Sequence, residues 1–152
     1  DYLLNKENLD KMKQYNPTLF YAFTKRAQLI LTEQWTKRHG PGSSSALAGK
    51  VRFHCMHPGW ATTEGVADAL EGGRLGLDNT DGFRTAAQGA DTITFLASTS
   101  NEEVKQSGEM WFERRVSVKH YGGWFGGTTS SNKLDERLWA KASEFVGGLP
   151  SQ

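Results

Sequence analysis

Two residues four positions apart have the chemistry to move a proton. Tyr21 and Lys25 lie in a stretch whose apolar spacing predicts a helix, so their side chains would share one face, one turn apart. A phenol titrates near pH 10 and is a weak acid and base at neutral pH. A cation held within about 4–6 Å favours the phenolate form. The pair is therefore a candidate general acid and base for an alcohol or carbonyl oxygen, although this spacing also arises by chance in many helices.

A second candidate is the turn that follows a predicted strand. His57 is followed by Pro58, Gly59 and Trp60, and Thr63 comes four residues after the glycine. In open parallel sheets, ligands bind beyond the carboxyl ends of the strands. A Pro-Gly pair fixes a turn there and lets the backbone approach a ligand closely. Taken alone, however, the motif favours a plain strand-ending turn.

The order and separation of these motifs resemble the C-terminal half of the short-chain dehydrogenase/reductase family. That half carries a helix with Tyr-x-x-x-Lys, a loop, a buried strand and a Pro-Gly turn. The runs that carry the resemblance are residues 21–26, 31–35, 57–61 and 88–92, and the closing Leu138, Trp139 and Ser143 also suit the retinol-dehydrogenase-like branch. The resemblance extends over residues 15–146, which is nearly the whole chain.

The resemblance implies an oxidoreductase that interconverts alcohols and carbonyls with NAD or NADP. Tyr21 would be the catalytic acid and base, passing a proton to the carbonyl oxygen as hydride arrives from the nicotinamide. Lys25 would favour the phenolate form of Tyr21 and bind the nicotinamide ribose. The cofactor supplies the hydride chemistry, whereas the protein supplies orientation and the proton.

The resemblance also implies roles for the turn after the strand. Pro58, Gly59 and Trp60 would form the wall beside the nicotinamide, and Thr63 would bond the carboxamide or the adjacent phosphate of the cofactor. Residues 64–81 correspond to the variable substrate lobe of the family. The substrate would be a small alcohol or carbonyl compound, and family analogy indicates an apolar one.

Two parts of the family pattern have no counterpart in this sequence. The glycine-rich phosphate-binding turn precedes the catalytic tyrosine in the family, yet the 20 residues before Tyr21 contain no glycine. The glycines of residues 40–42 and 122–127 come after Tyr21. The same 20 residues contain no serine, and Thr18 is too close to serve as the family's catalytic serine. We therefore expect both parts to lie upstream of Asp1, and the 152 residues alone to be inactive.

The elements that must position these residues alternate between helix and strand. The spacing predicts helices over residues 17–39, 82–98 and 132–146 and strands over residues 50–57 and 108–118. In the first helix an apolar stripe should face the core; it consists of Leu19, Phe20, Phe23, Ala27, Ile30 and Leu31. This order predicts an α/β fold, the C-terminal portion of a Rossmann-type doubly wound parallel sheet, with residues 1–152 as part of one domain. Two strands do not make an independent sheet, so further strands are expected from outside this sequence.

Composition narrows the class of protein. The 152 residues are 37% hydrophobic and 23% charged, which excludes a disordered chain, a collagen-like repeat and a disulfide framework. A net charge of +1 gives no reason to expect nucleic acid, and no apolar run is long enough to span a membrane. A single cysteine, Cys55, favours a reducing, intracellular compartment. No metal is expected, because strand alternation would put His54 and His57 on opposite faces.

Other interpretations stay open at this point. The chain could be a non-catalytic truncated isoform or an interaction module, with Phe20, Leu31 and Trp35 extending a docking face on the first long helix. It could also come from a complete but catalytically inactive dehydrogenase. The resemblance further suggests a homo-oligomer formed through the helix that carries Tyr21. The sequence does not distinguish NAD from NADP, and it does not give the reaction direction.

Overall fold

The computed structural model describes residues 17–71, 73, 80–100, 102–120 and 132–147. Within them the chain forms four helices and one three-stranded mixed sheet, so the described part is α/β. The glycine-rich stretch 122–127 and most of the loop that follows residue 71 lie outside the described residues. The helices are α2 (Pro17–His39), α3 (Glu64–Glu71), α4 (Ala86–Ser98) and α5 (Asn132–Gly147), and the strands are β1 (His54–Met56), β2 (Glu109–Phe112) and β3 (Arg115–Ser117).

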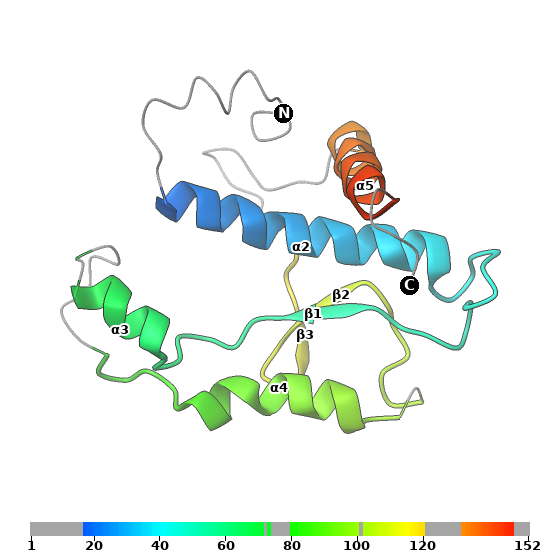
Figure 1. Cartoon of the computed structure of the whole chain (residues 1–152). Coiled ribbons are helices and arrows are strands. Elements are labelled where there is room, and N and C mark those ends of the chain that lie inside the picture. Colours follow the sequence, from blue (N-terminus) through cyan, green and yellow to red (C-terminus); the bar gives the residue numbers. More distant parts are fainter. Residues whose placement is uncertain (1–16, 72, 74–79, 101, 121–131, 148–152) are drawn as a thin grey trace, which may run out of the picture.

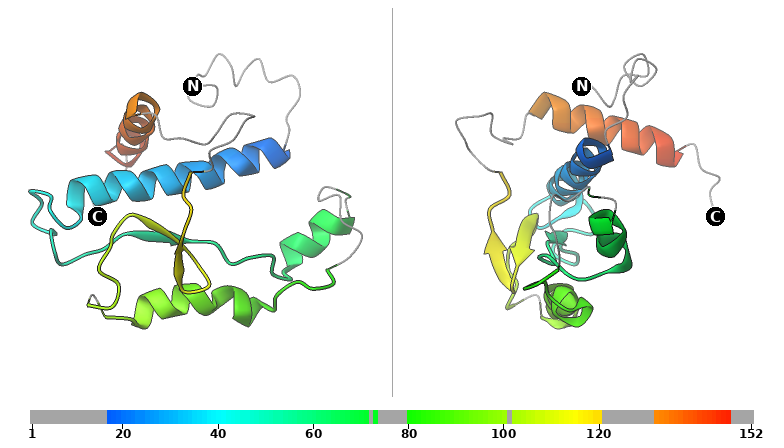
Figure 2. Two further views of the ribbon diagram at one scale, coloured as in Figure 1. Left: turned by 180° about the vertical axis from the view of Figure 1, so that it is seen from behind. Right: turned by 90° about the vertical axis from the view of Figure 1, so that its left-hand side faces the viewer.

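The elements stack in layers on either side of the sheet. Figure 1 shows α2 lying over one face of the sheet and α4 over the other, while α5 crosses the outer side of α2. The view along the layers in Figure 2 gives the same order, from α5 through α2 and the sheet to α4. The short helix α3 lies beyond the carboxyl end of β1, at the same end of the molecule as the N-terminal half of α2.

The helix α2 has the bounds that the sequence predicts, but its apolar stripe is only partly packed. Ile30 and Gln34 are buried, at 4% and 6% exposed. Phe20 and Phe23, near the start of the stripe, are 36% and 38% exposed, so this end of the predicted core-facing stripe is only partly covered. The described neighbours of α2 are α5 and the sheet, and in Figure 1 both lie along its middle and C-terminal part.

The sheet confirms one sequence prediction and corrects another. The strands β1 and β2 pair in parallel, with Cys55 opposite Met110. The single strand predicted over residues 108–118 is wrong, because the chain reverses direction at Glu113 and Arg114 and β3 returns antiparallel to β2. Both turn residues have positive φ, 51° and 58°, as a tight hairpin turn of two residues requires. The strand expected over residues 50–57 is also shorter and covers His54–Met56.

The helix α4 begins later than predicted because a capping box fixes its start. The sequence places a helix over residues 82–98, whereas the helix begins at Ala86. The Thr85 hydroxyl accepts a hydrogen bond from the Gln88 N–H at 3.2 Å, and the Gln88 side chain accepts one from the Thr85 N–H at 2.8 Å. Residues 82–85 therefore form a turn that leads into the helix.

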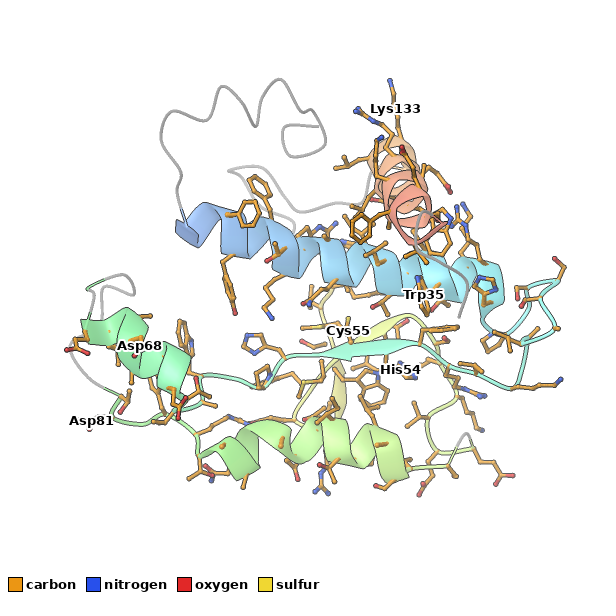
Figure 3. The ribbon with its side chains drawn as sticks, in the orientation of Figure 1. Trp35, His54, Cys55, Asp68, Asp81 and Lys133 are labelled. Atoms are coloured by element: carbon orange, nitrogen blue, oxygen red, sulfur yellow. The ribbon has the colours of Figure 1, made fainter. Side chains whose placement is uncertain are left out.

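Aromatic side chains fill the space on both sides of the sheet. Trp111 of β2 is 6% exposed, and its ring packs against Phe95 of α4 at 6.2 Å and against the His54 ring at 5.7 Å, centroid to centroid. On the other face, Trp35 of α2 contacts Phe53 edge to face, with centroids 5.4 Å apart, and Figure 3 shows it between α2 and β1. The amino-terminal end of β1 is thus packed between α2 on one face and, through Trp111, α4 on the other.

The helix α5 is attached to the outer side of α2 by both charge and packing. Glu136 forms ion pairs with Lys37, at 2.7 Å, and with Arg38. The Arg38 guanidinium lies over the Trp139 ring, 4.4 Å from its centroid. None of the helices in the described part of the chain is both long enough and apolar enough to cross a membrane.

Candidate active site

The proposed proton-transfer pair lies on the exposed N-terminal half of α2. The Lys25 ammonium nitrogen is 5.4 Å from the centroid of the Tyr21 ring, within the range of a cation–π contact. The spacing of four in a regular helix therefore brings the cation next to the phenol. The Tyr21 side chain is 62% exposed, so a ligand could approach it.

The turn after β1 has a defined internal geometry. The His57 N–H donates to the Trp111 carbonyl at 2.9 Å, so the pairing with β2 continues one residue past the strand. The Gly59 N–H then donates to His57 Nδ1 at 2.9 Å. Gly59 has a φ of +76°, a conformation that L side chains adopt at a cost. Trp60 is 55% exposed, and its ring lies 5.5 Å from that of Phe83.

Thr63 has a structural role as well as the predicted cofactor role. Its hydroxyl accepts a hydrogen bond from the Val66 N–H at 3.3 Å, and its carbonyl accepts from Val66 at 3.1 Å and from Ala67 at 3.0 Å. Thr63 therefore caps the N-terminus of α3. A hydroxyl that accepts one bond still has its proton to donate, so capping and ligand binding are compatible.

The two halves of the candidate site lie at the same end of the molecule. In Figures 1 and 3 the N-terminal half of α2 lies on the same side as the segment that runs from β1 into α3. Between the residues that the structure describes, no hydrogen bond or ion pair joins Tyr21 or Lys25 to residues 57–63. The phenol and the turn therefore lie at the same end of the molecule, but among the described residues no hydrogen bond or ion pair links them.

Sequence reasoning missed the residue that holds the turn. Arg84, just before α4, donates its N–H to the Trp60 carbonyl at 2.8 Å and accepts the Thr62 N–H at 2.8 Å. The pairing of Ala61 with Arg84 forms an isolated parallel bridge. Such long-range pairing leaves no local pattern in the sequence, so motif spacing alone could not have identified Arg84.

Two other chemically reactive side chains, His54 and Cys55 of β1, are partly buried and make contacts within the fold. The His54 Nδ1 accepts a hydrogen bond from Trp111 Nε1 at 3.1 Å, and burial lowers the pKa of His54. Burial raises the pKa of the Cys55 thiol, whose sulfur lies 3.6 Å from the Met110 sulfur. A protonated thiol is a poor nucleophile and a poor metal ligand. Among the described residues, no group of three or more His, Cys, Asp or Glu side chains is placed to hold a metal ion.

A hollow elsewhere on the surface does not include the candidate site. It has a volume of about 330 Å³ and lies between α2 and the start of β1; its walls are Leu31, Thr32, Trp35, Arg52, Phe53 and His54. Neither Tyr21, Lys25 nor residues 57–63 contribute to it. This hollow is therefore separate from the candidate proton-transfer pair and from the turn after β1.

Comparison with known proteins confirms the resemblance to the short-chain dehydrogenase/reductase family. Two relatives carry the name dehydrogenase/reductase SDR family member 12. The human protein is 36% identical over 120 residues, which is 77% of this chain and 34% of that protein. The bovine protein is 33% identical over 142 residues, which is 90% of this chain and 40% of that protein. The chain therefore spans between a third and two fifths of the length of these relatives.

By sequence, then, the chain is a relative of short-chain dehydrogenases and reductases, a family of oxidoreductases. No protein-family model matches the chain, and no solved structure gives a significant match.

Proposed function

We propose that the protein containing this chain interconverts alcohols and carbonyls with NAD or NADP. The chain would supply the proton-transfer pair and the wall beside the nicotinamide. The observation that carries the proposal is the Lys25 ammonium 5.4 Å from the Tyr21 ring centroid, on an exposed face at the same end of the molecule as the turn after β1. The spacing of Tyr21 and Lys25 alone is weak support for a proton-transfer role, and the similarity to dehydrogenase/reductase relatives strengthens it.

The residues present fit the nicotinamide end of such a cofactor. The turn 57–60 lies beyond the carboxyl end of β1, where open parallel sheets bind ligands, and Trp60 offers an exposed aromatic surface. Thr63 keeps a hydroxyl proton to donate. When bound, NAD or NADP would supply or accept the hydride. Pro58, Gly59 and Trp60 would hold the nicotinamide ring in place and keep water from one side of it.

Tyr21 and Lys25 would handle the proton. In the reducing direction, the Tyr21 hydroxyl gives its proton to the carbonyl oxygen of the substrate. The adjacent Lys25 ammonium stabilises the phenolate that remains, and its N–H groups can donate to the ribose hydroxyls of the cofactor. In the oxidising direction, the phenolate takes the proton from the alcohol. The exposure of Tyr21 leaves room for this exchange.

The proposal extends to the fold and to what the chain lacks. The parallel pair of β1 and β2, connected through α3 and α4, is the unit from which doubly wound sheets are built. In the described sheet β1 is an edge strand. We propose that the complete domain is a doubly wound Rossmann-type sheet and that residues outside this chain supply the phosphate-binding turn and the catalytic serine. The chain alone would then be inactive, and residues 64–81 would contact an apolar substrate.

The test is turnover by the full-length protein after Tyr21→Phe. We expect kcat to fall by between about 100-fold and 10,000-fold, the range that general acid–base groups contribute, with no change in the thermal midpoint. Phe23→Leu is the matched control, because Phe23 is an aromatic residue on the same exposed half of α2, and this variant should keep its activity. Unchanged nicotinamide-dependent turnover in Tyr21→Phe would rule out the proposed role of the phenol.

A further inference from the structure

A residue with no assigned role connects the turn after β1 to two other parts of the fold. The backbone of Arg84 pairs with the segment 60–62 through the two hydrogen bonds described above. Those bonds depend on the main chain and would form with any residue except proline at this position. The side chain of Arg84 makes three further contacts, and these depend on which residue stands at this position.

The first contact is with Gly59. A Cβ atom added to Gly59 would lie 2.7 Å from Arg84 Nε and 2.8 Å from Arg84 Cδ. The arginine side chain therefore occupies the space beside the glycine and packs directly on the backbone of the turn. Gly89 of α4 approaches the same segment from another side, because a Cβ there would lie 3.1 Å from the Ala61 Cβ and 3.5 Å from the Pro58 Cβ.

The second and third contacts join the turn to the β2–β3 hairpin. The Arg84 guanidinium lies over the Phe112 ring, 5.0 Å from its centroid, and forms an ion pair with Glu113. The Phe112 ring also packs edge to face against the His57 ring, with centroids 6.0 Å apart. Phe112 ends β2, and Glu113 is the first residue of the hairpin turn. One side chain thus links the Pro-Gly turn, the last residue of β2 and the hairpin.

We infer that Arg84 is a positioning residue for the nicotinamide wall, because its side chain holds the turn 58–60 against the end of β2. This inference rests on the proposed function. The planar guanidinium can stack on Phe112, pair with Glu113 and pack against Gly59 at the same time, whereas a lysine ammonium is a point charge that cannot reproduce this arrangement. Displacement of a positioned group by about 1 Å can cost as much as about 100-fold in rate, so loss of this support should be measurable.

The chain offers a matched control in Arg114. This arginine also pairs with a carboxylate, Asp91, and also lies over an aromatic ring, that of Phe95, at 5.6 Å. Its contacts are with α4, and none of them involves residues 57–63. Arg84→Met and Arg114→Met therefore remove the same kind of interaction from two different places.

The first experiment reads the position of the turn without a cofactor. The full-length protein is labelled with 5-fluorotryptophan, and the ¹⁹F resonance of Trp60 is assigned from Trp60→Phe. We expect Arg84→Met to shift or broaden this resonance and Arg114→Met to leave it unchanged. An unchanged Trp60 resonance in a folded Arg84→Met protein would overturn the inference. This outcome does not depend on catalysis, so it is separate from a failure of the proposed function.

The second experiment measures turnover with NAD or NADP. We expect Arg84→Met to lower kcat/KM by between about tenfold and 100-fold, mainly through a higher KM for the cofactor, and Arg84→Lys to lose less. Arg114→Met should stay near the wild-type values. If Arg84→Met and Arg114→Met lower kcat/KM equally at the same thermal stability, Arg84 has no specific positioning role and the inference is wrong.

Discussion

The two halves of the candidate site are held in very different ways. The turn after β1 is fixed by hydrogen bonds to Trp111 and Arg84, by a bond from Gly59 to His57, and by the packing of α4 against it. Tyr21, by contrast, is 62% exposed, and its side-chain contact among the described residues is the Lys25 ammonium. One half is therefore positioned by tertiary structure and the other by the regular geometry of a single helix.

This difference predicts how each half responds to substitution. Changes on the exposed half of α2 remove chemistry but few packing contacts, so they should lower activity and leave stability unchanged. Changes in the turn or beneath it disturb packed atoms, so they should lower both stability and cofactor binding. A substitution that reverses this pattern would show that the two halves are not held as described.

Lys25→Met should give the largest separation of activity from stability. Loss of the ammonium that lies 5.4 Å from the Tyr21 ring centroid, and of its proposed hydrogen bonds to the ribose, should lower kcat/KM by about 100-fold. Steady-state kinetics and thermal unfolding of the full-length protein measure the two effects. Lys37→Met is the control, since Lys37 lies on the same helix but pairs with Glu136, and it should keep its activity. A large fall in the thermal midpoint of Lys25→Met would place this lysine among the structural residues.

Gly59→Ala should affect both stability and cofactor binding. Alanine at a positive φ costs about 1–2 kcal/mol, and its Cβ would also collide with the Arg84 side chain. Gly82→Ala is the matched control, because Gly82 has a φ of +79° but no atom within 4 Å of an added Cβ. We expect a larger fall in the thermal midpoint and a higher cofactor KM for Gly59→Ala than for Gly82→Ala. Equal effects would mean that the contact with Arg84 is unimportant.

The ring of His54, at the start of β1, should make stability depend on pH. Burial, with a smaller contribution from Arg52, lowers the pKa of His54, and Glu109 opposes the shift. As the pH falls below about 6.5, the unfolded chain takes up a proton before the folded one does. Stability from this group is therefore present above about pH 6.5 and decreases as the pH falls toward the lower pKa of the folded state.

His54→Asn should flatten this dependence. Asparagine keeps a hydrogen-bond acceptor for Trp111 Nε1 but does not titrate. Thermal midpoints measured between pH 7 and pH 5 should therefore fall less in this variant than in the wild type. His39→Asn, at the end of α2, should keep the wild-type slope. The same slope in His54→Asn and the wild type would show that another group controls the effect.

Much of the helical structure could be predicted from local signals. Pro17 and Gly40 bracket α2 because proline suits a first helical turn and glycine suits the residue after a helix. The capping box of Thr85 and Gln88 was also present in the sequence and would have corrected the start of α4. The hairpin was missed because Glu113 and Arg114 adopt positive φ without the glycine or asparagine that usually signals such a turn.

The candidate site could be predicted only where its parts are local. The helix period alone places Lys25 beside Tyr21. The residues that hold the turn, Arg84 and Gly89, lie about 25 to 30 positions away, and their contacts depend on how α4 packs against β1. The sequence also did not indicate that the Thr63 hydroxyl caps the N-terminus of α3.

The most direct test is a structure of the full-length protein with an oxidised nicotinamide dinucleotide and an alcohol bound. The nicotinamide ring should contact Pro58, Gly59 and Trp60, and the alcohol oxygen should lie within about 2.6–3.2 Å of the Tyr21 hydroxyl. A nicotinamide ring bound against another surface, or a Tyr21 hydroxyl that points away from the alcohol, would contradict the assignment of these two regions to one active site.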